Sequence, residues 1–320
     1  MNLKKFSEME LSKSTQRVLK ERGFVSATPV QSLVIPKLMS GKSVAVQSKT
    51  GTGKTLAYAI PIVEKLKPVR RVQALILCPT RELAIQVSEQ FNFLLKYRHQ
   101  RAITLYGGQK IGIQFKALKK GGKVVVGTPG RVIDHLKRGT LNLKNVETFV
   151  LDEADEMLDM GFLDDVRKIL ERTSPRQGIL LSATMSKEVV KLGKKLQEGM
   201  EFLRISRDEL TPPSVRQYYF KVREGEKFDL IFSFLSLKDP TSAMVFCNTK
   251  KKVDEVASFL KSKGVRADSI HGDLRQHTRE KVMRNFRMGR TKVLVATDVA
   301  ARGIDIGGVE MVVNFDLPGA

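Results

Sequence analysis

The chain carries the same pattern of short apolar runs and longer helical stretches twice, and this repeat restricts its fold more than any other feature. Runs rich in β-branched residues occur at VAVQ (44–47), ALILC (74–78), VVV (124–126), FVLD (149–152) and GILLS (178–182). Between the last two runs, Phe162, Val166, Ile169 and Leu170 have the spacing of one apolar helix face. Such alternation predicts a parallel sheet that helices cover on both sides.

Four segments recur later in the chain in the same order. ALILCPTRELA (74–84), LYGG (105–108), KVVVGT (123–128) and VETFVLDE (146–153) correspond to AMVFCNTKKKV (243–253), SIHG (269–272), KVLVAT (292–297) and VEMVVNFD (309–316). The polar, proline-containing segment SRDELTPPS (206–214) interrupts both periodicities, which is typical of a join between domains. The sequence therefore predicts two tandem copies of one α/β domain, at 1–208 and 209–320.

The two copies differ after their last shared strand. The first copy continues through a helix, the strand in GILLSAT (178–184) and a second helix, whereas the second copy ends at Ala320, shortly after the equivalent strand. We therefore expect the second domain to be incomplete, with one face and one edge of its sheet uncovered. The alternative is a second domain that is naturally shorter.

Net charge indicates the kind of partner. Lys and Arg number 56 against 34 Asp and Glu, which gives a formal net charge of +22. Such an excess favours a polyanion, because each phosphate that a basic side chain neutralises releases a condensed counterion. A highly charged surface without such a partner is the alternative.

The cysteines indicate the compartment. Cys78 and Cys247 each lie in an apolar run, and we expect both to be unpaired core residues in a reducing environment. No apolar run reaches the roughly 18 residues that a membrane span needs. The sequence therefore predicts a cytoplasmic protein.

The segment SVAVQSKTGTGKT (43–55) has the order of strand, glycine-rich turn and helix start that a phosphate-binding loop requires. In such a loop, successive backbone N–H groups and the helix N-terminus surround the phosphates, and the glycines let the backbone approach. We expect Lys54 to reach the β- and γ-phosphate oxygens and the Thr55 hydroxyl to bind Mg²⁺. The strict pattern begins with Gly, where this chain has Ser48, so an ordinary glycine-rich turn is the alternative.

The run VLDEAD (150–155) supplies the carboxylates that a phosphate loop needs for its metal and its water. We expect Asp152 to hold Mg²⁺ and Glu153 to orient or deprotonate a water in line with the γ-phosphate. Acidic residues at a strand end can also begin a solvated helix. Their pairing with Lys54 and Thr55 in the same repeat favours the catalytic interpretation.

The tetrad Asp152-Glu153-Ala154-Asp155 resembles the signature of the DEAD-box ATP-dependent RNA helicases of superfamily 2, and the resemblance extends over nearly the whole chain. It implies an α/β fold of two tandem RecA-like domains, each a mainly parallel sheet flanked by helices. It also implies an enzyme that hydrolyses ATP with Mg²⁺, binds single-stranded RNA along its backbone and separates RNA duplexes locally. ATP and RNA would bind on different faces of the cleft between the domains.

The resemblance also extends to the nucleotide side. GFVSATPVQ (23–31) resembles the adenine-reading segment, with Phe24 against the base and Gln31 on its edge, and ATDVAARGID (296–305) places Asp305 near the ribose. Ser182-Ala183-Thr184 resembles the motif that links the nucleotide state to strand separation, and its hydroxyls are implied to contact the acidic tetrad. The predicted nucleotide site comprises Phe24, Thr28, Gln31, Ser48, Lys49, Thr50, Gly51, Thr52, Gly53, Lys54, Thr55, Asp152, Glu153 and Asp305. Catalysis is assigned to Lys54, Asp152, Glu153, Ser182 and Thr184, and the metal to Thr55 and Asp152.

On the RNA side, several segments at strand ends and helix starts resemble the family's backbone-contacting motifs. N–H groups and hydroxyls at such places can bind phosphates without reading the base sequence. The implied contacts are Pro79, Thr80, Arg81, Gly107, Gly108, Thr128 and Arg131 in the first domain, and Asn248, Thr249, Gln276, Arg279 and Thr297 in the second.

One family motif has no counterpart in the sequence given. In the family, a strand such as VVNFDLP (312–318) is followed by a histidine- and arginine-rich segment that supplies an arginine finger, and this sequence ends at Ala320. Because arginine fingers contribute roughly 10³–10⁵-fold in rate, we expect the chain as given to hydrolyse ATP poorly. Two alternatives stay open, namely a nucleotide-dependent RNA-binding fragment with little catalysis and a DNA helicase of similar twin-domain fold.

Overall fold

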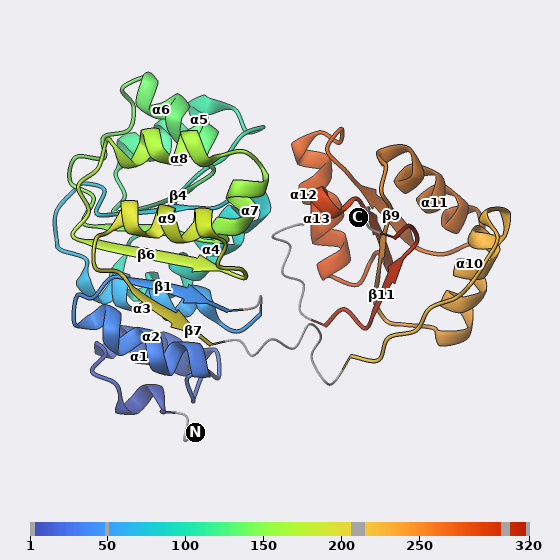
Figure 1. Ribbon diagram of the computed structural model, residues 1–320, viewed down its shortest axis with the longest axis horizontal. Helices are drawn as coiled ribbons and strands as arrows, with labels where there is room; N and C mark the ends of the chain where they lie inside the picture. Colours follow the sequence, from blue (N-terminus) through green and yellow to red (C-terminus); the bar gives the residue numbers. More distant parts are fainter. Residues whose placement is uncertain (1–3, 49–50, 206–214, 302–307, 318–320) are drawn as a thin grey trace. The chain divides into compact units, whose positions relative to one another are not determined.

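The computed structural model describes residues 4–48, 51–205, 215–301 and 308–317. Internal contacts divide the chain into two compact units, Met1–Leu210 and Thr211–Ala320. Each unit is a sheet flanked by helices (Figure 1). The boundary predicted between residues 208 and 209 lies outside the described residues and stays a prediction.

The first unit is built on a seven-stranded parallel sheet of order β3-β4-β2-β5-β6-β1-β7. Its strands are β1 (Val44–Gln47), β2 (Ala74–Leu77), β3 (Ile103–Leu105), β4 (Val124–Gly127), β5 (Thr148–Leu151), β6 (Gln177–Ser182) and β7 (Glu201–Arg204). Its helices are η1 (Phe6–Glu8), α1 (Lys13–Glu21), α2 (Pro29–Met39), α3 (Lys54–Lys65), α4 (Arg81–Leu94), η2 (Lys96–Arg98), α5 (Ile111–Lys120), α6 (Pro129–Lys137), α7 (Ala154–Asp159), α8 (Leu163–Leu170) and α9 (Lys187–Leu196). The five predicted strands and the predicted helix at α8 are confirmed. β3 and β7 have no predicted counterpart, because β3 has only three residues and the residues of β7 alternate between half-buried and exposed and form no continuous apolar run.

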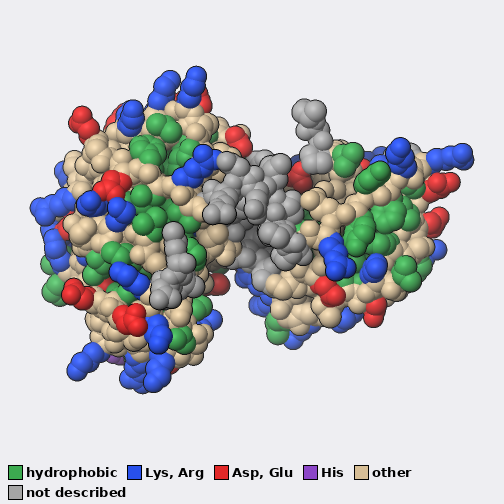
Figure 2. All heavy atoms as spheres, turned by 60° about the horizontal axis from the view of Figure 1, so that its bottom comes forward, with side chains coloured by type: hydrophobic (Ala, Val, Ile, Leu, Met, Phe, Trp, Pro, Cys, Tyr) green, Lys and Arg blue, Asp and Glu red, His purple; other side chains and the backbone are tan. Residues whose placement is uncertain are grey.

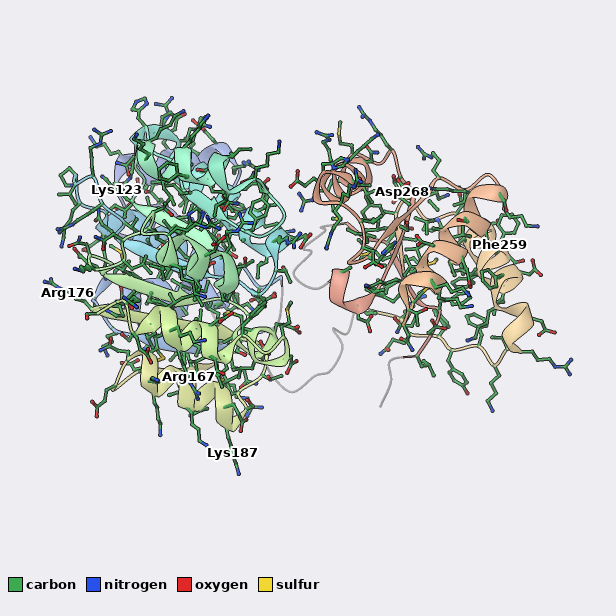
Figure 3. All side chains as sticks on the ribbon, turned by 90° about the horizontal axis from the view of Figure 1, so that it is seen from above. Lys123, Arg167, Arg176, Lys187, Phe259 and Asp268 are labelled. Carbon is green, nitrogen blue, oxygen red and sulfur yellow. The ribbon has the colours of Figure 1, made fainter. Side chains whose placement is uncertain are left out.

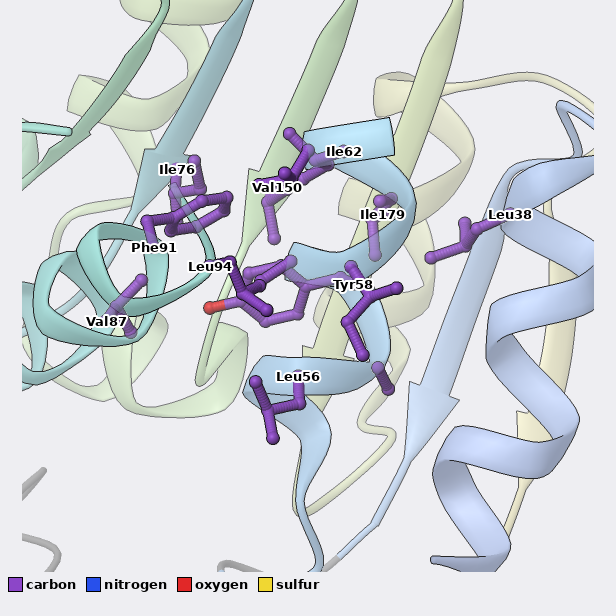
Figure 4. Packing of buried hydrophobic residues seen from close by; sticks show 14 of the residues in the cluster. Leu38, Leu56, Tyr58, Ile62, Ile76, Val87, Phe91, Leu94, Val150 and Ile179 are labelled. Atoms are coloured by element: carbon purple, nitrogen blue, oxygen red, sulfur yellow. The ribbon is translucent and has the colours of Figure 1, made fainter. Parts of the chain in front are cut away.

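Successive residues of the central strands enter two apolar layers on opposite faces of this sheet. Val44 and Val46 of β1 pack with α2, α3 and α4, whereas Ala45 packs with α6, α8 and α9. Figure 4 shows part of the first layer, in which Tyr58 of α3 lies beside Phe91 of α4 with a ring separation of 6.2 Å. Because helices cover both faces, the strands are apolar at almost every position.

The second unit repeats the topology of the first. Its parallel sheet has the order β11-β8-β10-β9, which matches β5-β2-β4-β3 strand for strand. The strands are β8 (Ala243–Phe246), β9 (Ala267–Ile270), β10 (Val293–Ala296) and β11 (Met311–Asn314), with helices η3 (Glu224–Glu226), α10 (Lys227–Lys238), α11 (Lys250–Ser262), α12 (Gln276–Arg287) and α13 (Asp298–Ala301). The predicted duplication is therefore confirmed at the level of strand order.

Strand register corrects one of the predicted correspondences by a single residue. Leu105 pairs with Gly127 in the first sheet, and Ile270 pairs with Ala296 at the equivalent place in the second. Leu105 therefore corresponds to Ile270, whereas the alignment of LYGG with SIHG matched it to Ser269. The sequence similarity of these two segments rests on the glycines, and the pairing of the strands sets the register.

β11 differs from its equivalent, β5, in its surroundings. β5 is fully buried between β2 and β6, whereas β11 pairs only with β8 in the described part of the chain. Val312 of β11 is 59% exposed. The edge of the second sheet that was expected to lack cover is therefore uncovered within the described residues.

The surface is strongly basic. Figure 2 shows lysine and arginine side chains spread over the visible face of each unit, and Arg176 and Lys187 are exposed at the margin of the first (Figure 3). This distribution provides the positive field predicted from the net charge. Within the described ranges, none of the helices has the length and the apolar run needed to span a bilayer.

Candidate active site

The predicted catalytic segments all follow the carboxyl ends of strands. The phosphate loop follows β1, the acidic tetrad follows β5, and Ser182-Ala183-Thr184 begins at the last residue of β6. β5, β6 and β1 are neighbours in a parallel sheet, so these segments meet at one edge of it. Strand order thus brings together a lysine and two acids that are far apart in the sequence.

Two side chains at the start of α2 hold the phosphate loop in shape. Thr28 and Gln31 form a capping box at the N-terminus of this helix. The Thr28 hydroxyl also donates to Thr52 O at 2.8 Å, and Gln31 Nε2 donates to Gly53 O at 3.1 Å. Gly53 has a φ of 87°, and a Cβ there would lie 2.5 Å from Gln31 Nε2, so the turn requires glycine. The segment assigned to adenine therefore also braces the loop.

Lys54, the first residue of α3, is buried and directed at the loop. Its Nζ donates to Ser48 O at 2.6 Å. Ser48, which stands where the strict loop pattern has Gly, lies with its Oγ 2.8 Å from Thr52 Oγ1. Lys49 and Thr50, also predicted to bind nucleotide, lie outside the described residues. The loop therefore accommodates serine through a hydrogen bond between two of its own hydroxyls.

The two acids behind β5 lie where water is largely excluded. Asp152 is 3% exposed, and burial raises its pKa even though Tyr58 Oη donates to Oδ2 at 2.7 Å. Glu153 is half-buried, and burial, followed by the charge of Asp152, raises its pKa to about 7. Glu153 also has a left-handed backbone, with a φ of 54°. A strained backbone and a pKa near neutrality together are typical of a catalytic acid or base.

Asp155 connects the acidic tetrad to the end of β6. Its Oδ2 accepts hydrogen bonds from Ala183 N at 3.1 Å, Thr184 N at 2.8 Å and Thr184 Oγ1 at 3.0 Å. Its own N–H donates to Ser182 Oγ at 3.3 Å. The contact that the resemblance implies between these hydroxyls and the tetrad is therefore present.

The side chains at this edge of the sheet fit Mg²⁺ that is shared with a nucleotide better than a metal ion held entirely by protein ligands. Among the described residues, no group of three or more His, Cys, Asp or Glu side chains could hold a metal ion. Asp152 and Thr55 offer one carboxylate and one hydroxyl. Mg²⁺ takes one or two carboxylates and completes its octahedron with phosphate oxygens and water, so this sparse set fits Mg²⁺ that arrives with a nucleotide.

Phe24 lies at the surface of the first unit. It is 39% exposed, and its edge-to-face partner is Phe93 of α4, with ring centroids 6.3 Å apart. An exposed aromatic ring supported from one side is a suitable surface for stacking a base. Asp305, assigned to the ribose, lies outside the described residues.

The residues of the first unit assigned to RNA follow three neighbouring strands. Pro79, Thr80 and Arg81 follow β2, Gly107 and Gly108 follow β3, and Thr128 and Arg131 follow β4. Thr80 caps α4 by accepting from Leu83 N at 3.2 Å. Arg81 packs on Gly107, where a Cβ would lie 3.5 Å from a guanidinium nitrogen. Sheet order therefore gathers the three motifs at the same edge as the phosphate loop, and their RNA contacts stay predictions.

The corresponding residues of the second unit occupy equivalent places. Asn248 and Thr249 follow β8, Thr297 follows β10, and Gln276 and Arg279 lie on α12. Thr249 caps α11 by accepting from Lys252 N at 3.2 Å, as Thr80 caps α4. Asn248 Nδ2 donates to Leu317 O at 2.9 Å, and Thr297 Oγ1 accepts from Ala300 N at 3.4 Å. Arg279 reaches the same residue through a nitrogen 3.4 Å from Ala300 O. The side chain of Gln276 is not among those described.

Three residues near these motifs were not singled out from the sequence. Tyr58 reads as a core aromatic of α3, and Gln114 and His135 read as ordinary polar positions on α5 and α6. The structure buries all three: Tyr58 bonds to Asp152 and Gln114 to Arg131, both predicted site residues, and His135 lies against Gln114. A polar group within an apolar helix face, as at Tyr58, is the one sequence signal that could have indicated this.

Comparison with known proteins identifies the family. Residues 28–192 match the DEAD/DEAH box helicase family, and residues 226–320 match the helicase conserved C-terminal domain. The DEAD-box ATP-dependent RNA helicase CshA of Geobacillus kaustophilus is 47% identical over 315 residues, which cover 98% of this chain and 68% of that protein. The CshA protein of Bacillus subtilis is 45% identical, over 98% of this chain and 64% of that protein. This chain therefore belongs to the DEAD-box helicase family.

Solved structures of the family share the fold. Dbp5 of S. cerevisiae, bound to RNA and ADP BeF3, superposes with a TM-score of 0.89 at 32% identity, covering 99% of this chain and 82% of that chain. A DEAD box protein of Methanococcus jannaschii gives a TM-score of 0.61 at 42% identity, over 98% of this chain and 85% of that chain. The predicted fold of two parallel-sheet α/β domains is thus confirmed. The chain spans 60–68% of the length of the curated relatives it matches.

Proposed function

We propose that this chain is an ATP-dependent RNA helicase that binds the backbone of single-stranded RNA and separates short duplexes, coupled to ATP hydrolysis. The observation that carries the proposal is that Lys54 follows β1 while Asp152 and Glu153 follow β5, two strands of one parallel sheet with only β6 between them. The names of the CshA relatives and the RNA and ADP BeF3 bound to Dbp5 support the same chemistry.

Each of the three side chains has a distinct task in hydrolysis. Lys54 exchanges its bond to Ser48 O for phosphate oxygens and so stabilises the negative charge that develops on them. Glu153, with its pKa near 7, accepts a proton from the attacking water. The water oxygen bonds to the γ-phosphorus while the bond to the β-phosphate oxygen breaks, which yields ADP and inorganic phosphate. Asp152 accepts a hydrogen bond from Tyr58 Oη and orients the site.

We propose in addition that Asp152 and Thr55 hold Mg²⁺ when the nucleotide binds. When bound, the ion would supply positive charge that offsets the phosphates and the two acids. A cytoplasmic location is also part of the proposal, and it is supported by Cys78 and Cys247, which are free and buried.

The route from nucleotide to RNA runs through Asp155. This residue lies two positions after Glu153 in the chain, and its carboxylate accepts three hydrogen bonds from Ala183 and Thr184 at the end of β6. A change at the acids on hydrolysis therefore reaches the end of a second strand through a single side chain. Such a coupling requires that ATP and RNA each favour the same state of this link.

The test is ATP hydrolysis in the presence of single-stranded RNA or of DNA of matched sequence. RNA is expected to stimulate turnover and DNA is not, because contacts to the 2′-hydroxyl distinguish the two. Lys54→Ala and Glu153→Gln are each expected to lower turnover by roughly 10²–10³-fold. Lys116→Ala, at an exposed position of α5, is the matched control and is expected to change nothing. Equal stimulation by DNA would favour a DNA helicase, and unchanged turnover in Lys54→Ala would refute the site.

A further inference from the structure

The side chain of Gln114 uses all of its hydrogen-bonding capacity between two segments that are assigned to RNA, the loop after β3 and helix α6. Gln114 lies on α5 and is 1% exposed. Its Nε2 donates to Tyr106 O at 2.9 Å and to Gln109 Oε1 at 3.0 Å. Its Oε1 accepts from an Arg131 guanidinium N–H at 3.2 Å and lies 3.1 Å from His135 Nε2. An amide offers two donors and two acceptor positions, and all four are occupied here.

The orientation of this amide follows from the chemistry of its partners. A guanidinium can only donate, so the amide oxygen must face Arg131, and a backbone carbonyl can only accept, so the NH₂ group must face Tyr106 O. His135 is fully buried, and burial, followed by the positive charge of Arg131, lowers its pKa. A neutral His135 whose proton is on Nε2 donates to Gln114, and the Thr140 hydroxyl lies 2.8 Å from its Nδ1. The network therefore has one consistent arrangement of hydrogens.

The network ties the loop after β3 to the helix after β4. Arg131 donates to Gln109 O at 3.0 Å in addition to Gln114, and it is 14% exposed. Gln109 directly follows Gly107 and Gly108, so Arg131 is fixed against the end of the glycine loop. Gly107 of the same loop packs on Arg81. Three segments assigned to the RNA backbone are thus held together, with the Gln114 amide connecting two of them.

We propose that Gln114 is a positioning residue for RNA binding, which holds the Gly107–Gly108 loop against Arg131 in the arrangement that the RNA backbone requires. This inference rests on the proposed RNA-directed function. A loop and an arginine that are ordered before RNA arrives lose less conformational freedom on binding, so preorganisation raises affinity without a contact between Gln114 and RNA. The alternative is that this buried network only stabilises the first unit. The two ideas differ because the phosphate loop and its acids make no hydrogen bond with Gln114 among the described residues.

Two substitutions and one control separate these possibilities. Gln114→Leu keeps the approximate size and removes all four hydrogen bonds. Gln114→Glu keeps the acceptors for Arg131 but loses the donors to Tyr106 and Gln109 beside the glycine loop. If Gln114→Leu does not fold, Gln114→Glu alone distinguishes a role in RNA binding from a role in stability. Thr104→Val is the matched control, because it removes the bond from Thr104 Oγ1 to Ser88 Oγ, 2.8 Å long, on the same strand β3 but away from the loops.

The readouts are the Kd for a fluorescein-labelled single-stranded RNA, with a non-hydrolysable ATP analogue and Mg²⁺, and the Kd for a fluorescent ATP analogue without RNA. We expect Gln114→Leu to raise the RNA Kd about tenfold and Gln114→Glu about threefold, since ordering each side chain costs about 0.5–1.5 kcal/mol. The nucleotide Kd is expected to stay within about twofold of the original in all three variants, and the RNA Kd of Thr104→Val likewise.

An unchanged RNA Kd in both Gln114 variants would overturn the inference. So would an equal loss of nucleotide affinity, or an equal loss of RNA affinity in Thr104→Val, because each would indicate a general effect on stability. If the unsubstituted chain binds RNA no more tightly with the ATP analogue than without it, the proposed function itself fails, and this outcome is distinct from the others.

Discussion

Replacing Glu153 by Gln is expected to stabilise the first unit at alkaline pH and to leave it unchanged at acid pH. Burial and the charge of Asp152 raise the pKa of Glu153 from its ordinary value of 4.5 to about 7. Between these two values the folded chain binds a proton that the unfolded chain has lost, so stability falls as the pH rises through this window. Above this pH window, Glu153 is ionised in both the folded and the unfolded chain. The folded state then carries the full free-energy cost of a charged carboxylate in this partly buried site.

The size of the effect follows from the change in pKa. A rise from 4.5 to about 7 corresponds to about 3 kcal/mol, and because Glu153 is only half-buried we expect about 2 kcal/mol. Gln has nearly the same shape and no charge. The free energy of opening of Glu153→Gln should therefore equal that of the original chain near pH 4, below the ordinary pKa of 4.5, and exceed it by about 2 kcal/mol near pH 8.

Hydrogen exchange, followed by mass spectrometry in peptides of β5 and β6, measures this difference within the first unit alone. The two proteins are compared at each pH, so the intrinsic exchange rates cancel. Nucleotide and Mg²⁺ are left out, because a bound cation would favour the ionised acid and reverse the sign. Glu89→Gln, on the exposed side of α4, is the control for the loss of one negative charge. A difference that is constant with pH, or that favours the original chain at pH 8, would refute the reasoning.

Three further substitutions test the geometry of the site. Gly53→Ala is expected to weaken binding of a fluorescent ATP analogue at least tenfold, because φ is 87° and a Cβ would displace the Gln31 amide that braces the loop. Gly112→Ala, with nothing within 4 Å of the added Cβ, is the control and should bind the analogue as before; equal affinities of the two variants would contradict the account of the loop. Tyr58→Phe leaves a buried oxygen of Asp152 without its hydrogen-bond donor at 2.7 Å and should lower the stability of the first unit by about 1–3 kcal/mol. Hydrogen exchange measures this loss, and an unchanged stability would show that the bond contributes nothing. Thr184→Val removes the hydrogen bond from Thr184 Oγ1 to Asp155 and should reduce the stimulation of ATP hydrolysis by RNA roughly tenfold, at unchanged affinity for ATP. A parallel loss of ATP affinity would argue against a coupling role.

The positions of the strands and of the site were accessible from the sequence because both depend on local patterns. Apolar runs predict buried strands, and side chains directly after parallel strands must meet at one edge, so the sequence alone predicts that Lys54 and Asp152 lie near each other. The duplication was equally visible, because four segments of the first half recur in the same order in the second half. The register of the segment around Ile270 was not, since only the pairing of strands decides between alignments one residue apart.

The supporting contacts could not be predicted, because they join residues that no local pattern relates. Tyr58 and Asp152 are 94 positions apart, and the spacing of Tyr58 on α3 is that of a core residue. Gln114 and His135 lie on different helices, and only the adjacency of β3 and β4 brings them together. Sequence reasoning therefore located the groups predicted to contact the nucleotide more readily than those that hold them in place.

The central claim is that ATP bound at Lys54 controls the affinity for RNA, and one titration tests it directly. The Kd of the chain for a labelled single-stranded RNA is measured with and without a non-hydrolysable ATP analogue and Mg²⁺, in the original chain and in Lys54→Ala. We expect the analogue to lower the RNA Kd at least tenfold, about 1.4 kcal/mol of coupling, and to have no effect in Lys54→Ala. An RNA affinity that does not change with the analogue, or that changes equally in Lys54→Ala, would contradict the account.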